Sequence, residues 1–238
     1  MFVPISDDNP LKAIHFQVVT VGLIAINVIV FALSSVNVDA YAVAEFAVVP
    51  DELFLGTTST LAPDGIPASH LPEALTLITY MFFHADIWHL TGNMLFLWVF
   101  GDNVEDAVGH VKFLFFYLAC GVAAALVHAA MVTGTDGAGV PLIGASGAVA
   151  GVIAAYLMLH PRVRVWVLAF KVIPLQISAE FALGAWIVTQ IVMVLMPAVG
   201  PVAWWAHIGG LISGAILILF LRRRGVPLFD RELDVAQQ

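Results

Sequence analysis

Residues 142–160 read LIGASGAVAGVIAAYLMLH, an apolar stretch whose beginning is interrupted by small and polar residues. About 20 apolar residues are enough for a helix to cross the hydrocarbon core of a bilayer. Five further apolar stretches occur at residues 18–36, 87–100, 113–132, 177–196 and 202–221. The stretch at 87–100 is the shortest of them. The sequence therefore predicts an all-α, polytopic membrane protein built as a bundle of six transmembrane helices.

The composition supports the membrane class. Of the 238 residues, 61% are hydrophobic and 11% are charged, and the mean hydropathy is +0.98. Soluble domains are about 45–50% apolar and about 25% charged, so a soluble globular protein is excluded. The net charge is −8 and no basic stripe could follow a phosphate backbone, so we expect no nucleic-acid partner.

The basic residues indicate an orientation, because lysine and arginine collect in cytoplasmic loops. With the N-terminus inside, all nine fall on one side: Lys12, Lys112, Arg162, Arg164, Lys171, Arg222, Arg223, Arg224 and Arg231. A seventh span at residues 163–175 would export the last arginines, so we interpret that stretch as an interfacial loop. The predicted organisation is a cytoplasmic segment 1–15, a membrane domain 16–222 with an outside loop at about 37–86, and a cytoplasmic tail 223–238. We expect a prokaryotic cell (inner) membrane.

Three of the predicted helices carry strongly polar side chains near their outer ends, namely His89 and Asn93, Ser146, and His207. Polar groups inside spans are costly and usually face a bundle interior or a water-filled cavity. A serine needs an adjacent base to act as a nucleophile, and a histidine suits that task. The Asn93 amide, the His89 imidazole and the Ser146 backbone N–H could donate to an oxyanion. Together these residues predict a Ser–His dyad for acyl transfer.

Glycines at helical spacing predict that two of these helices approach closely. Gly144, Gly147 and Gly151 lie in residues 142–160, and Gly210 and Gly214 lie in residues 202–221. Pairs of small residues four apart let helix backbones touch in a membrane. Taken singly, the serine, the histidines and the glycines are more often packing or interfacial residues. Their convergence at one depth favours a site.

Three motifs resemble those of the rhomboid intramembrane serine proteases. HLTGN at residues 89–93, followed by Gly101 and Glu105, resembles the HxxxN and GxxxE pattern of that family. GASG at residues 144–147 resembles its GxSG motif, and AHIGG at residues 206–210, followed by Gly214, resembles its AHxGGxxxG motif. The resemblance covers the whole predicted six-helix core.

The resemblance implies a serine endopeptidase that cleaves transmembrane segments of other membrane proteins near the outer face of the bilayer. It implies that Ser146 is the nucleophile, that His207 is the base, and that His89 and Asn93 stabilise the oxyanion. We expect the lipid bilayer and transmembrane substrates as partners. We expect no metal and no cofactor, since no His-Glu-x-x-His pattern or pair of intramembrane aspartates is present.

Two departures from the family pattern stand out. The first loop has no tryptophan or arginine where many rhomboids carry a Trp-Arg pair, and Ala150 replaces an aromatic residue that stacks on the catalytic histidine. We therefore expect another residue to orient His207, either Tyr156 or one on another helix. Two alternatives remain open: a derlin-like, non-proteolytic scaffold and a small transporter, for which Glu180 would be the only acid within a span.

Overall fold

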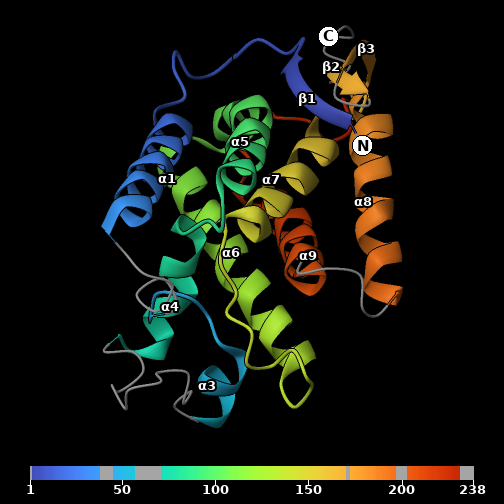
Figure 1. The fold of residues 1–238 in the computed structure, drawn as a ribbon. Helices are drawn as coiled ribbons and strands as arrows, with labels where there is room; N and C mark the ends of the chain where they lie inside the picture. The colour runs from blue at the N-terminus through green and yellow to red at the C-terminus, as the bar shows by residue number, and fades with distance from the viewer. Residues whose placement is uncertain (1, 38–44, 57–70, 170–171, 197–202, 231–238) are drawn as a thin grey trace, which may run out of the picture.

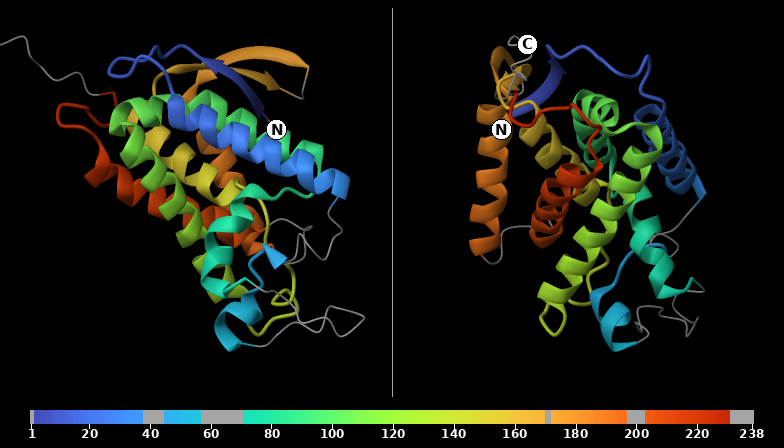
Figure 2. Two further views of the ribbon diagram at one scale, coloured as in Figure 1. Left: turned by 90° about the vertical axis from the view of Figure 1, so that its left-hand side faces the viewer. Right: turned by 180° about the vertical axis from the view of Figure 1, so that it is seen from behind.

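A computed structural model describes residues 2–37, 45–56, 71–169, 172–196 and 203–230. Helices account for most of this part of the chain, and a small sheet covers one end of them (Figures 1 and 2). The helices are α1 (Val18–Asn37), α3 (Pro50–Leu55), α4 (Glu73–Thr79), the 3-10 helix η1 (Tyr80–Phe82), α5 (Ile87–Val108), α6 (His110–Val132), α7 (Ser146–Leu159), α8 (Ala179–Leu195) and α9 (Trp204–Leu221). The strands are β1 (Phe2–Asp7), β2 (Arg164–Ala169) and β3 (Ile173–Ser178).

Among the described residues, three helices are long and apolar enough to cross a membrane: α1, α6 and α9. Helices α7 and α8 are apolar but have only 14 and 17 residues. Helix α5 has 22 residues and continues past the predicted end at residue 100, through Asp102, Glu105 and Asp106. The structure is thus a helical fold with three candidate spans, and the count of six remains a prediction.

Helix α7 lies at the centre of the bundle. It packs against α5, α6 and α9, whereas α1 and α8 lie at opposite edges (Figures 1 and 2). Most of its side chains are buried, and many are alanine or glycine, including Gly147, Ala150 and Gly151. Small side chains allow neighbouring helices to surround α7 closely. The helix that begins at Ser146 is therefore held on several sides.

The sheet is antiparallel, in the order β1-β2-β3. Strand β1 pairs with β2 from Phe2 opposite Ala169 to Asp7 opposite Val165, with an irregularity between Pro4 and Ser6. Along β2, alternate side chains are buried against the bundle, as expected of a half-buried strand. The stretch interpreted as an interfacial loop is thus a β-hairpin rather than a helix, and part of the N-terminal segment is its partner.

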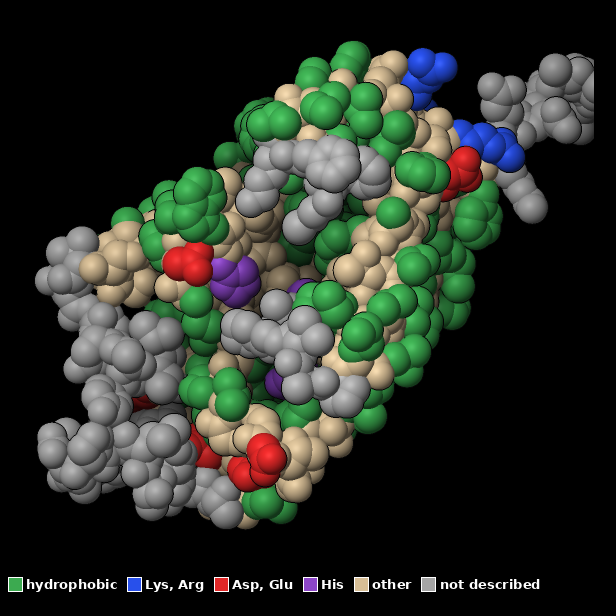
Figure 3. All heavy atoms as spheres, turned by 45° about the vertical axis from the view of Figure 1, so that its right-hand side comes forward, with side chains coloured by type: hydrophobic (Ala, Val, Ile, Leu, Met, Phe, Trp, Pro, Cys, Tyr) green, Lys and Arg blue, Asp and Glu red, His purple; other side chains and the backbone are tan. Residues whose placement is uncertain are grey.

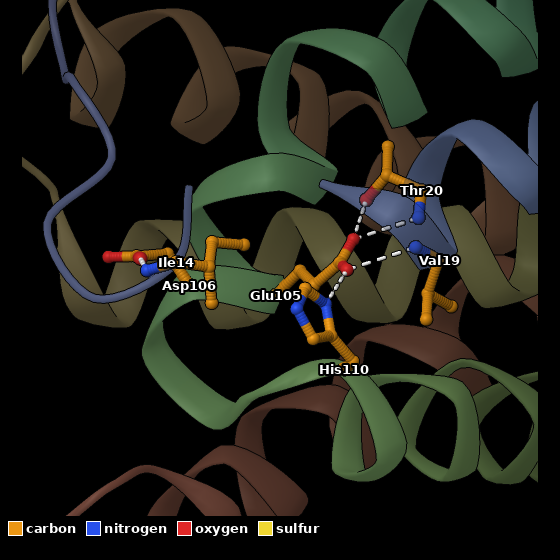
Figure 4. A network of polar contacts seen from close by, with 6 residues as sticks. All are labelled: Ile14, Val19, Thr20, Glu105, Asp106 and His110. Carbon is orange, nitrogen blue, oxygen red and sulfur yellow. Dashed lines mark hydrogen bonds and ion pairs between the residues drawn. The ribbon is translucent and has the colours of Figure 1, made fainter. Parts of the chain in front are cut away.

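A buried carboxylate fixes the start of α1 (Figure 4). Glu105 of α5 is fully buried and accepts hydrogen bonds from the backbone N of Val19 at 2.9 Å and of Thr20 at 2.8 Å. It also accepts one from the Thr20 hydroxyl at 2.7 Å, and its other oxygen lies 2.5 Å from Nδ1 of His110. The first N–H groups of a helix have no partner within it, and a carboxylate there is stabilising.

Neighbouring segments are attached at the same end of the bundle. Asp106 accepts hydrogen bonds from the backbone N of Ala13 and of Ile14, both at 2.7 Å. Asp230, near the end of the described chain, accepts one from the backbone N of Arg162 at 2.8 Å. Buried or half-buried carboxylates therefore hold segments distant in sequence at this end of the bundle, by accepting hydrogen bonds from backbone N–H groups.

Candidate active site

The turn before Ser146 is held by the first residue of η1 and by the loop that follows η1. The backbone N of Gly144 donates to the carbonyl oxygen of Tyr80 at 2.9 Å, and that of Ala145 donates to Nε2 of His84 at 3.4 Å. Burial, with a smaller contribution from His89, lowers the pKa of His84 to about 4. The His84 ring is therefore neutral at pH 7, and its Nε2 can accept a hydrogen bond.

His89 lies directly against this turn. Gly144 has a φ of +112°, and a Cβ at this position would lie 2.6 Å from Cε1 of His89. Both observations require glycine there. Asn93, one turn further along α5, is buried and donates one amide hydrogen to the carbonyl oxygen of His89 at 3.0 Å. The structure thus brings His89 to the start of α7, while Asn93 uses one of its two amide hydrogens within its own helix.

The backbones of α7 and α9 touch at the predicted glycines. A Cβ on Gly210 would lie 1.9 Å from the carbonyl oxygen of Gly147, and one on Gly214 would lie 2.2 Å from that of Gly151. No side chain larger than hydrogen fits at either position. Because Gly147 follows Ser146 directly, the first turn of α7 lies beside the first two turns of α9.

His207 lies in the first turn of α9 and is 8% exposed. Its Nδ1 is 2.7 Å from Oε1 of Gln190 on α8. The ring centroid is 5.8 Å from that of Trp186 and 5.9 Å from that of Trp204. The imidazole is therefore held by one hydrogen bond and by two indole rings.

Tyr156 does not orient His207, and that option is wrong. The Tyr156 hydroxyl lies near the other end of α7 and donates to the carboxylate of Asp7 at 2.5 Å. Ala150 is fully buried and faces α9, since its Cβ would lie 3.2 Å from a Cβ at Gly210. The close contact between α7 and α9 leaves no room for an aromatic ring there. The hydrogen bond to His207 comes from Gln190 on α8 instead.

A cavity of about 610 Å³ adjoins His207. Phe96 and Phe100 of α5 and several residues of α8 form its walls, and Pro4 and Val167 of the sheet lie at its boundary. Its lining is mainly apolar, with Gln190 and His207 among the polar groups. On the face shown in Figure 3, histidine side chains lie in a hollow bordered by hydrophobic side chains. An apolar segment or side chain could thus reach the imidazole.

Two polar contacts of the site are missing from the sequence-based prediction. His84 supports the turn before Ser146, and Gln190 contacts His207. A buried amide within the apolar stretch 177–196 is costly, and that signal could have identified Gln190. Within the described residues, no group of three or more His, Cys, Asp or Glu side chains could hold a metal ion.

Residues 72–224 match the family model described as the Rhomboid domain. The chain belongs to the rhomboid family. Among curated rhomboids it is 31% identical to "Presenilin-associated rhomboid-like protein A, mitochondrial" of Danio rerio, over 62% of this chain and 37% of that protein. It is 27% identical to "Rhomboid protein 1, mitochondrial" of Saccharomyces cerevisiae, over 70% of this chain and 47% of that protein. The chain therefore spans less than half the length of these relatives.

The names of these relatives contradict the prediction of a prokaryotic cell membrane. A third rhomboid, "RHOMBOID-like protein 12, mitochondrial" of Arabidopsis thaliana, is 29% identical over 62% of this chain and 46% of that protein. All three names place those relatives in mitochondria. The lysine and arginine bias reports the orientation of spans and not the membrane that holds them, so the charge pattern could not identify the compartment.

Proposed function

We propose that this rhomboid is an intramembrane serine endopeptidase that uses Ser146 as nucleophile and His207 as general base. The observation that supports this most directly is the backbone contact between Gly147 and Gly210. These glycines follow Ser146 by one residue and His207 by three. A nucleophile and its base must come within about 3 Å of each other in the reacting complex, and touching helices make that approach possible.

In the proposed reaction, the Ser146 hydroxyl attacks a peptide carbonyl carbon while Nε2 of His207 takes the hydroxyl proton. The tetrahedral intermediate then collapses, the peptide C–N bond breaks, and the imidazolium gives that proton to the leaving amine. Water attacks the resulting ester by the reverse route, with His207 again as base. The products are two peptides and the free serine, so no cofactor is required.

Three donors could stabilise the oxyanion. The start of α7 has no side-chain cap, so the backbone N–H of Ser146 is a candidate donor. The His89 imidazole lies against Gly144, two residues before Ser146. Asn93 keeps a second amide hydrogen after donating the first to its own helix. These donors belong to α5 and α7, whose contact is part of the bundle core.

The proposed substrates are transmembrane segments of other membrane proteins. A helical segment satisfies its own backbone hydrogen bonds, so it must unwind locally before its carbonyl can be attacked. The apolar cavity bounded by α5, α8 and α9 supports this proposal, because it offers an apolar surface next to His207. Unwinding would be easiest near the bilayer surface to which the N-termini of α7 and α9 are directed.

The test is cleavage of a single-span model substrate in lipid vesicles by wild type, Ser146→Ala, His207→Ala and a serine control. Ser213→Ala is the control, because Ser213 also lies on a core helix and its hydroxyl donates to the carbonyl of Gly210, at 3.0 Å, within the same helix. Wild type and Ser213→Ala should cleave the substrate and react with a fluorophosphonate. The other two variants should do neither. Equal cleavage by Ser146→Ala would refute the proposal, and a folded wild type without activity would favour the scaffold alternative.

A further inference from the structure

We infer that Gln190 is the positioning residue of the active site, which fixes the tautomer and the orientation of His207. This inference rests on the proposed function. Gln190 is 3% exposed, and its Oε1 lies 2.7 Å from Nδ1 of His207. A buried amide in an apolar helix is costly unless both its oxygen and its nitrogen find partners. The partner of the amide oxygen is Nδ1 of His207.

A second hydrogen bond determines which way the amide points. The Nε2 of Gln190 donates to the carbonyl oxygen of Trp186, one turn earlier in α8, at 3.0 Å. A carbonyl oxygen can only accept, so the nitrogen of the amide must be on that side. The oxygen is then the atom that faces His207, and it too can only accept.

The tautomer of His207 follows from this direction. An acceptor at 2.7 Å requires that Nδ1 carries the proton. In a neutral imidazole the other nitrogen, Nε2, then has a free lone pair and can receive the proton of Ser146. A rotated amide or an apolar residue at position 190 would remove this preference. Gln190 therefore selects the form of His207 that can act as a base.

The orientation of the ring is restricted by the same part of α8. The Trp186 ring lies 5.8 Å from the His207 ring at an interplanar angle of 37°, and the Trp204 ring lies 5.9 Å away at 88°. Trp186 thus supplies both a neighbouring ring and the carbonyl that orients Gln190. One turn of α8 holds the imidazole by a directional bond and by packing.

The experiment compares wild type with Gln190→Met, Gln190→Glu and Val188→Ala in vesicles. Methionine has a similar volume without the amide acceptor, glutamate retains an acceptor, and Val188 is an exposed control on the same helix. Gln190→Met should lower kcat by about 10- to 100-fold, because the base is misplaced. KM should stay within about twofold, because methionine fills the same part of the cavity wall. Gln190→Glu should regain most of kcat, and Val188→Ala should match wild type.

The Gln190→Glu protein also gives a test that does not depend on the methionine variant. A carboxylate beside Nδ1 favours the imidazolium, so the acid limb of kcat/KM should move to higher pH. The titratable groups that act on the His207 ring from other helices are His89 and His128, and both are retained in this variant. An unmoved limb would overturn the inference. So would a Gln190→Met protein with the kcat of wild type.

Parallel measurements separate this inference from the proposed function. If Ser146→Ala is inactive and Gln190→Met is fully active, only the role of Gln190 is overturned and the proposed function stands. Cleavage by Ser146→Ala at the wild-type rate would overturn the proposed function. A Gln190→Met protein that loses activity and melting temperature together, and is not restored by glutamate, would show a structural role and overturn the inference.

Discussion

The hydroxyl of Tyr156, on the helix that begins at Ser146, donates a hydrogen bond to the carboxylate of Asp7 on the N-terminal strand at 2.5 Å. Burial raises the pKa of Asp7 from 3.8 to about 6, with a smaller contribution from the charge of Asp8, although the bond from Tyr156 acts in the opposite direction. The folded protein therefore prefers protonated Asp7. The stability that protonated Asp7 contributes is complete below pH 3.8 and is lost as the pH rises through about 6.

Asp7→Asn should therefore be more stable than wild type at pH 7–8. The amide oxygen can still accept from Tyr156 and carries no charge to bury. We expect a gain on the order of 1 kcal/mol after allowance for solvent screening, which disappears toward pH 4. Thermal unfolding in detergent between pH 4 and 8 measures it. Asp136→Asn, in an exposed loop, is the control. A gain of the same size at every pH would contradict the prediction.

His84 should give the opposite dependence on pH. Its folded-state pKa, about 4, lies below the 6.5 of a free histidine, so folding favours the neutral ring. That contribution is complete above pH 6.5 and is lost as the pH falls through 4. His84→Gln keeps an acceptor for the backbone N of Ala145 without titrating. Between pH 6.5 and 4, this variant should lose less stability than wild type, as measured by unfolding in detergent. The control is His15→Gln, at an exposed position, which should not differ from wild type. Identical curves for all three proteins would refute this.

Glu105→Gln should destabilise the attachment of α1. The two carboxylate oxygens of Glu105 serve four donor groups, whereas glutamine has only one acceptor oxygen. The amide hydrogens of the glutamine would also face the N–H groups of Val19 and Thr20. Leaving buried donors without partners costs about 2–4 kcal/mol here. The melting temperature should fall, whereas exposed Glu180→Gln should leave it unchanged. An unaltered melting temperature for Glu105→Gln would show that the network contributes little.

Gly210→Ala should separate α7 from α9. The new Cβ would lie 1.9 Å from the carbonyl oxygen of Gly147, a backbone atom that cannot move unless the helices part. We expect a loss of at least about 3 kcal/mol and no cleavage of a model substrate. Gly184→Ala is the matched control, since nothing lies within 4 Å of a Cβ there and alanine favours a helix. Folding measured by resistance to proteolysis, with activity on the same samples, checks both. Equal behaviour of the two variants would contradict the prediction.

Local patterns predicted the helices well where apolar length was the signal. The start of α5 at Ile87 coincides with the predicted start, because apolar residues begin there and Asp86 caps the helix through its side chain. The predicted end at residue 100 is too early. Acids such as Glu105 suggest solvent in the sequence, but here the carboxylate is buried and fully hydrogen-bonded by a different segment. Such partners come from tertiary structure and leave no local sign.

In the candidate site, too, local features could be predicted from the sequence and tertiary contacts could not. The glycine spacing that favours a close approach of two helices is local, and the structure has backbone contacts at Gly147 and Gly210. The contact between Gln190 and His207 depends on where α8 lies beside α9, and residue spacing does not encode that position. The sheet was missed for a similar reason, since β1 finds its partner more than 150 residues further along the chain.

That pairing sets an order on assembly of the protein. Strand β1 has no partner until residues 164–169 have been synthesised, and by then α1, α5, α6 and α7 have already been made. Contacts of such high sequence separation form late, because a long loop must close before they can stabilise anything. The bond from Tyr156 to Asp7 likewise joins the first described strand to a helix 149 residues further along the chain.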